Sequence, residues 1–154
     1  MRMGNQWLKL GGILSFGVAL LHVVIIFVGA SAYRYFGAGE DMAKAAELGS
    51  AFPAVLTLVL VAIFAIWGFY GLSGAGIIRR LPLLKIALIL IGAVYTLRGV
   101  AVFQLLFQIV TSAAEVAPRE ITFSLVSLVI GLAYLIGTIT SWRSLGASNR
   151  IVQT

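Results

Sequence analysis

The sequence predicts an all-α integral membrane protein, a four-helix up-down-up-down bundle with both termini on the cytoplasmic side. Of the 154 residues, 61% are hydrophobic and only 10% are charged, whereas soluble domains carry about 25% charged residues. The apolar residues gather in four long runs, and most basic residues lie at the ends of these runs that would share one side of a bundle. We therefore expect lipid to be the solvent for most of the molecular surface.

Each of the four runs is long enough to cross a bilayer as a helix. The runs cover residues 10–36, 52–78, 83–110 and 121–142. About 20 apolar residues in helical form span a hydrocarbon core of about 30 Å. Membrane β-strands would instead show alternating segments of about ten residues. We expect these four helices to form a single transmembrane domain over residues 1–154.

The first run resembles a signal peptide at both of its ends. Arg2 and Lys9 precede it, and Ala30-Ser31-Ala32 matches the pattern of a signal-peptidase site. The apolar region of a signal peptide is only about 7–15 residues long, however, and this run is longer. We therefore expect an uncleaved first helix.

Prolines and short polar segments indicate the other boundaries. Pro53, Pro82 and Pro118 each stand at the head of an apolar run, where the missing N–H has no helical partner to lose. Residues 40–48 are rich in helix formers and predict a short helix at the outer interface. Residues 112–115 read Ser-Ala-Ala-Glu, which matches either a capping box or a loop with that spacing by chance.

The charged residues predict the orientation. Seven basic residues lie at the N-terminus, the second connection or the C-terminus: Arg2, Lys9, Arg79, Arg80, Lys85, Arg143 and Arg150. The opposite side carries three basic residues and all five acids: Arg34, Lys44, Arg119, Glu40, Asp41, Glu47, Glu115 and Glu120. Since Lys-rich and Arg-rich loops stay in the cytoplasm, we expect both termini there, in a bacterial-type inner (plasma) membrane. The net charge of +6 then reflects topology, and we expect no nucleic-acid partner.

Several functional classes are excluded or disfavoured. Cysteine is absent, which excludes thiol redox chemistry and cysteine-based metal sites. Small multidrug exporters use a glutamate in the first span, but residues 10–36 contain no acid. Membrane enzymes that use glutathione carry Arg, His, Asn and Glu in the second span, and residues 52–78 contain none. With no nucleophile–base pair or metal set in the sequence, we predict no catalytic residue, metal or cofactor and consider an enzyme the less favoured class.

Arg98 is the strongest functional candidate because it lies deep inside the run 83–110. A charge near the bilayer centre costs several kcal/mol on insertion scales and marks a functional site by default. No acid lies inside any run, so its partner must come from elsewhere. We consider three alternatives: groups of this chain such as Glu115, Glu120, Gln104 or Gln108, an anionic ligand, and a partner protein.

Other polar and aromatic residues lie near the same depth. With about 1.5 Å of rise per residue, His22, Trp67 and Tyr134 come near the middle of the first, second and fourth runs, and Tyr95 shares a face with Arg98. These five residues are the candidate ligand-binding set. The alternative to ligand binding for the aromatic residues is packing in the core. His22 is the only histidine, and its alternatives are a neutral hydrogen-bonded imidazole and a proton-linked switch.

Small residues at helical spacing provide the second functional hypothesis. Gly11, Ser15 and Ala19 follow this spacing in the first run, as do Ser127 and Gly131 in the fourth. Such stripes allow membrane helices to approach closely.

The sequence therefore supports two functions from different classes. One is the binding or transport of a lipid, quinone or other amphiphilic anion between helices near Arg98 and His22. The alternative is a structural or accessory subunit that docks another membrane protein, or self-associates, through small-residue faces. Membrane lipids are partners in both cases.

Overall fold

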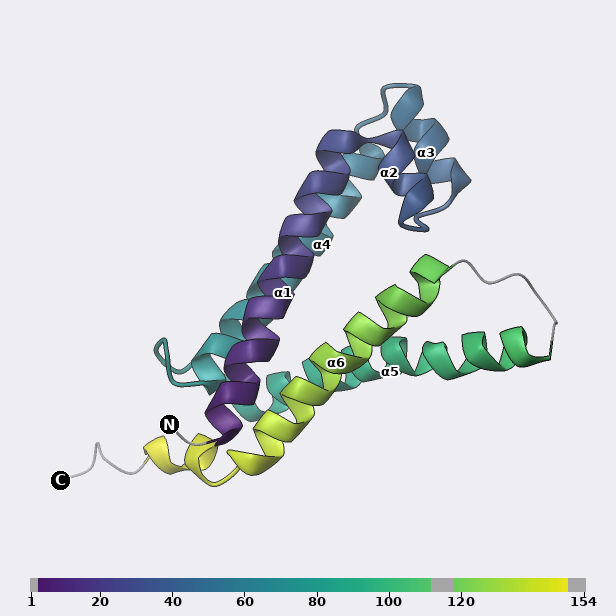
Figure 1. Cartoon of the computed structure of the whole chain (residues 1–154). Helices are drawn as coiled ribbons and strands as arrows, with labels where there is room; N and C mark the ends of the chain where they lie inside the picture. The colour runs from purple at the N-terminus through teal and green to yellow at the C-terminus, as the bar shows by residue number, and fades with distance from the viewer. Residues whose placement is uncertain (1–2, 112–117, 150–154) are drawn as a thin grey trace. The chain divides into compact units, whose positions relative to one another are not determined.

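The computed structural model describes residues 3–111 and 118–149, and this part of the chain is helical without any strand (Figure 1). The helices are α1 (Met3–Val28), α2 (Ala30–Tyr35), α3 (Glu40–Glu47), α4 (Phe52–Gly74), α5 (Leu84–Val110), α6 (Pro118–Thr140) and the 3-10 helix η1 (Ser144–Asn149). The all-α prediction is confirmed, as is the short helix expected at residues 40–48. Residues 112–115, for which the sequence left a capping box and a chance match open, lie outside the described residues.

Four helices are long and apolar enough to cross a membrane: Met3–Val28, Phe52–Gly74, Leu84–Gln104 and Pro118–Thr140. They correspond one to one with the four predicted runs. The fold is therefore that of a multi-pass membrane protein by helix length and composition. The order of the spans across the membrane and the side on which the termini lie stay predictions.

The predicted bounds of the first helix, residues 10–36, are wrong at both ends. The observed helix α1 begins at Met3 and ends at Val28, because Gly29 adopts a positive φ of 76°. The next helix, α2, begins at Ala30. The prediction depended on apolar length, which a single glycine does not interrupt. A glycine is nevertheless where a helix most readily reverses into the left-handed region. Arg34, inside the predicted span, therefore lies in α2 and outside α1.

The other boundaries differ by a few residues. α4 ends at Gly74 and not at residue 78, because Gly76 takes a φ of 76° and the Ile77 N–H donates to the Leu72 carbonyl at 3.0 Å. This pattern is a Schellman-type helix end. α6 begins at Pro118, as expected of a proline in the first turn. Pro82, by contrast, lies two residues before α5.

The described chain packs as two compact units, and α1 and α4 contribute to both. The α5–α6 unit comprises Met1–Ile13 and Phe69–Thr154, and the α2–α3 unit comprises Leu14–Gly68. The expectation of a single transmembrane domain over residues 1–154 stays a prediction.

Glycines bring the helices of the α5–α6 unit close together. A Cβ added to Gly99 on α5 would lie 2.5 Å from the Leu128 Cα, and one added to Gly131 on α6 would lie 2.5 Å from the Thr96 nitrogen. The contacts 96–131 and 99–128 run in opposite directions along the two helices, so α5 and α6 are antiparallel. Small residues serve this purpose in membrane proteins because helices gain packing energy from close approach.

The N-terminal part of α1 packs into the same unit. A Cβ added to Gly71 of α4 would lie 2.5 Å from the Gly12 Cα, and one added to Gly137 of α6 would lie 3.0 Å from the Leu8 nitrogen. Leu8 and Tyr134 are fully buried. The core of this unit therefore combines two large side chains with backbone contacts at glycines.

The α2–α3 unit has its own small core. Ile25, Ala32, Tyr33 and Ala43 are buried together, and Phe36 packs against them. In Figure 1, α2 and α3 fold back on each other.

Gly131→Ala tests the close contact between α5 and α6. The new methyl group would meet the Thr96 backbone, so we expect the free energy of unfolding in detergent to fall by about 1–3 kcal/mol. The measurement is an SDS or thermal unfolding curve followed by circular dichroism.

Gly17→Ala is the matched control, because nothing lies within 4 Å of a Cβ at Gly17. We expect this variant to be as stable as the wild type or up to about 1 kcal/mol more stable, since alanine favours the helix. Equal destabilisation of the two variants would contradict the packing described here.

Candidate functional site

Arg98 lies near the middle of α5. At 1.5 Å of rise per residue it is about 21 Å from the first residue of α5 and about 18 Å from the last. An arginine side chain snorkels along its aliphatic stem, but it is far shorter than either distance. The guanidinium therefore lies at hydrocarbon depth if α5 crosses the membrane along its length.

The structure places Arg98 at the edge of the buried face of α5 and not within it. Tyr95 and Val102 are buried, whereas Arg98 is exposed. The sequence placed Arg98 and Tyr95 on one inward face, and this is corrected. Gly99 occupies the contact with α6, and the neighbouring residue in a helix is turned about 100° from it.

The Arg98 guanidinium has no protein partner in the described ranges 3–111 and 118–149. It makes no hydrogen bond, ion pair or ring contact there. The two ion pairs of this part of the chain both belong to Arg34. Arg98 is thus a charged group inside an apolar helix that this part of the protein does not neutralise.

Two of the predicted aromatic residues stack in the α5–α6 unit. The Tyr95 and Tyr134 rings are nearly parallel, with an interplanar angle of 8° and centroids 6.2 Å apart. Gly11 of α1 faces the Tyr134 ring, since an added Cβ would lie 3.0 Å from it. Tyr134 is therefore a core residue that joins three helices, and Tyr95 is the aromatic neighbour of Arg98 one turn earlier on α5.

His22 and Trp67 both contact Phe64 in the α2–α3 unit. The His22 and Phe64 ring centroids are 4.9 Å apart, and Phe64 meets Trp67 edge-on at 5.3 Å. His22 Nδ1 lies 2.8 Å from the Val18 carbonyl oxygen. A carbonyl only accepts, so Nδ1 carries a hydrogen. This hydrogen bond is made within α1, and it is compatible with both alternatives considered from the sequence.

The five predicted residues therefore fall into two groups. Tyr95, Tyr134 and Arg98 belong to the α5–α6 unit, and His22 and Trp67 belong to the α2–α3 unit. Phe64 links the second pair and was not predicted. Its spacing of three residues from Trp67, one helical turn, was the available signal. The ligand-binding role of all five stays a prediction.

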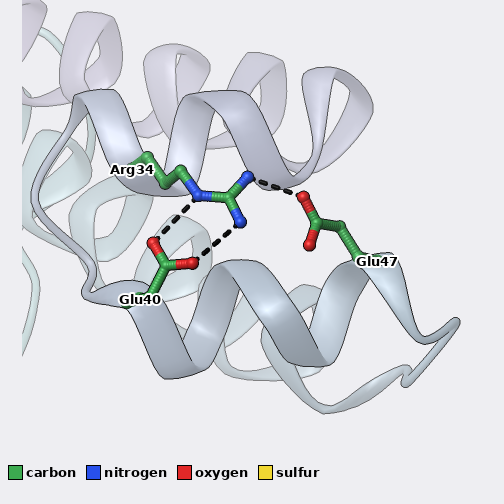
Figure 2. A network of polar contacts seen from close by, with 3 residues as sticks. All are labelled: Arg34, Glu40 and Glu47. Carbon is green, nitrogen blue, oxygen red and sulfur yellow. Dashed lines mark hydrogen bonds and ion pairs between the residues drawn. The ribbon is translucent and has the colours of Figure 1, made fainter.

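The sequence reasoning also missed an ionic clasp between α2 and α3. Arg34 donates from Nε and Nη2 to the two carboxylate oxygens of Glu40, each at 2.9 Å, and from Nη1 to Glu47 at 2.6 Å (Figure 2). Two parallel bonds to one carboxylate are the strong geometry for arginine. The charges had been used only to predict orientation. Glu40 and Glu47 are seven residues apart, which is two turns along one helix face. This spacing was the available signal for a shared basic partner.

The clasp shifts the acid–base properties of its members. The hydrogen bond to Arg34 lowers the pKa of the Glu40 carboxyl and that of the Glu47 carboxyl. The same bonds, that to Glu40 first, raise the pKa of Arg34. A carboxyl with a lowered pKa stabilises the fold above its unfolded pKa of about 4.3 and loses this contribution as the pH falls through the lower folded value. The clasp is therefore closed at neutral and mildly acidic pH.

Known proteins give no further assignment. Comparisons of the chain with protein-family models, with curated proteins and with solved structures find no match. Among the described residues, no group of three or more His, Cys, Asp or Glu side chains is placed to hold a metal ion.

An NMR titration of the carboxyl groups tests the clasp. We expect the Glu40 pKa to lie below its ordinary value and to rise toward it in Arg34→Gln, because the hydrogen bond to Arg34 is the largest cause of the shift. Lys44→Gln is the control, since Lys44 acts on Glu40 only through a smaller Coulombic interaction. A Glu40 pKa that is the same in wild type and Arg34→Gln would show that the clasp is absent in solution.

Proposed function

We propose that this chain is a multi-pass protein of a bacterial-type inner membrane that binds an amphiphilic anion at Arg98. In this proposal the four spans run up-down-up-down with both termini in the cytoplasm. One observation carries the proposal: an exposed arginine near mid-span has no hydrogen-bond or ionic partner in the part of the chain that the structure describes. Such a charge is several kcal/mol unfavourable in hydrocarbon unless something neutralises it.

Three of the described acids, Glu40, Glu47 and Glu120, are poorly placed to neutralise Arg98. Arg34 already holds Glu40 and Glu47. Glu120 lies in the first turn of α6. The contacts 96–131 and 99–128 put Arg98 of α5 level with residue 129 of α6. Glu120 lies nine residues before residue 129, which is about 13 Å along the axis of α6. These relations support a counter-anion that comes from outside the chain.

The surroundings of Arg98 favour an amphiphile over a small hydrated ion. Two residues precede it on α5: Leu97 is largely exposed and Val94 is half exposed. They provide apolar surface for a hydrocarbon chain. A planar guanidinium binds a carboxylate through two parallel hydrogen bonds. We therefore propose a long-chain carboxylate as the preferred ligand class among the lipids, quinones and other amphiphilic anions that the sequence suggested.

The small-residue faces favour binding over the accessory-subunit alternative. Gly71 meets Gly12, Gly99 meets Leu128, and Gly131 meets Thr96, all within the α5–α6 unit. These glycines are therefore already used for packing inside the chain. A partner that docked through them would have to displace these contacts.

Oleate binding to the protein in lipid nanodiscs, measured by native mass spectrometry, tests the proposal. We expect Arg98→Leu to lower the affinity about 10- to 100-fold, because a charge-assisted hydrogen bond is worth about 1.5–3 kcal/mol. Arg98→Lys keeps the charge but loses the bidentate geometry, so its affinity should be intermediate.

Lys44→Leu is the matched control, since it removes a positive charge from exposed α3 outside the spans. It should bind oleate as the wild type does. Equal oleate occupancy in wild type and Arg98→Leu would refute the proposal.

A further inference from the structure

Basic side chains gather at the N-terminal end of α5, around the segment Ser144–Gly146 at the start of η1. Arg80, in the connection before α5, donates from Nη1 to the Leu145 carbonyl at 2.9 Å and from Nη2 to the Ser144 carbonyl. These two bonds use only part of its five N–H donors. Arg80 therefore fixes the segment in place and retains donors for another group.

Lys85, in the first turn of α5, reaches the same segment. Its Nζ lies 4.4 Å from the centroid of the Trp142 ring, and a Cβ added to Gly146 would lie 2.8 Å from that Nζ. The ammonium is thus held between an aromatic face and a glycine. Arg143 is exposed and directly precedes the segment. Two cations, Arg80 and Lys85, thus reach the segment, and Arg143 is its neighbour in the sequence.

No acid that is described in the α5–α6 unit lies near these cations. The five acids of the chain are Glu40, Asp41, Glu47, Glu115 and Glu120. Of these, Glu120 is the one described in the α5–α6 unit, and it is about 30 Å away along α6. The positive charge at this end of the unit therefore has no counter-ion from the described residues of that unit.

Apolar side chains flank the cations. Leu83 and Ile139 are each more than 70% exposed, and Ile86 and Trp142 are about half exposed. They lie at the ends of two spans, α5 and α6, where tryptophan is typically found at a membrane interface. The site thus combines phosphate-binding donors with surface for acyl chains.

We propose that Arg80, Lys85 and Arg143 form a binding site for the phosphate of an anionic phospholipid, with Trp142 at its edge. The apolar flanks are the reason for choosing a lipid phosphate over free phosphate. Basic groups between helices on the cytoplasmic side recognise anionic headgroups in this manner. The site goes beyond the function proposed at Arg98, because Lys85 is about 20 Å from Arg98 along α5.

Trp142 provides a local reporter of this site. The chain has three tryptophans, so Trp7→Phe with Trp67→Phe leaves Trp142 as the single fluorophore. The protein is reconstituted in vesicles in which either phosphatidylglycerol or phosphatidylcholine carries brominated, quenching acyl chains. We expect half-maximal quenching at a mole fraction of phosphatidylglycerol about tenfold lower than that of phosphatidylcholine, since each basic group favours an anionic lipid several-fold.

Two double variants separate a site from diffuse charge. Lys85→Gln with Arg143→Gln should abolish most of this preference, and Arg80 is left unchanged because it holds the backbone of the segment. Lys9→Gln with Arg79→Gln removes the same charge from the same unit without touching Ser144–Gly146, and it should retain the preference. Circular dichroism establishes that both variants are folded.

Three results would overturn the proposal. The first is equal quenching by the two lipids in the reporter protein. The second is an equal loss of preference in the two double variants, which would indicate surface charge without a site. The third is release of the quenching by millimolar inorganic phosphate, which would indicate a site for free phosphate. Arg98→Leu should leave the preference intact, so failure of this site and failure of the oleate site are distinguishable.

Discussion

A polar group at hydrocarbon depth finds no partner in the lipid tails, because they neither donate nor accept hydrogen bonds. Several side chains of the spans satisfy this constraint locally. The hydroxyls of Thr57, Ser127 and Thr138 each donate to the carbonyl four residues earlier, at 2.7–2.9 Å. His22 does the same with the Val18 carbonyl. A backbone carbonyl satisfies a hydroxyl or a neutral imidazole, but it cannot neutralise a guanidinium. Arg98 therefore differs from the hydroxyls and the imidazole that bond to these carbonyls.

The same constraint explains how the helices pack. Between lipid-facing helices there is no hydrophobic effect to gain, so close contact of the surfaces is what holds them together. Gly12 against Gly71 and Gly131 against Thr96 provide such contacts. The second contact covers the Thr96 hydroxyl, which is buried without a hydrogen-bond partner in the described chain. Charged contacts are instead found outside the spans, at the Arg34 clasp and around Ser144–Gly146.

Sequence reasoning was sufficient for the spans because apolar length is a one-dimensional property of the chain. It failed at Gly29, where backbone geometry and not hydropathy ends the helix. It also set Arg98 on the inward face with Tyr95, because helical spacing alone does not say which flank of a face a neighbouring helix covers. The contact of Gly99 with Leu128 decides that question. The Arg34 clasp depends on the α2–α3 turn and likewise required three-dimensional structure.

A nitroxide label beside Arg98 tests whether this residue lies in the hydrocarbon of a membrane. The chain has no cysteine, so a single nitroxide can be attached at Leu97→Cys, beside Arg98 and largely exposed. Electron paramagnetic resonance in bilayers then compares its collisions with oxygen, which enters hydrocarbon, and with a polar nickel chelate, which does not. We expect high oxygen and low chelate accessibility at this position, and the reverse at Leu48→Cys in the connection before α4. Equal chelate accessibility at the two positions would contradict the membrane-embedded placement of Arg98.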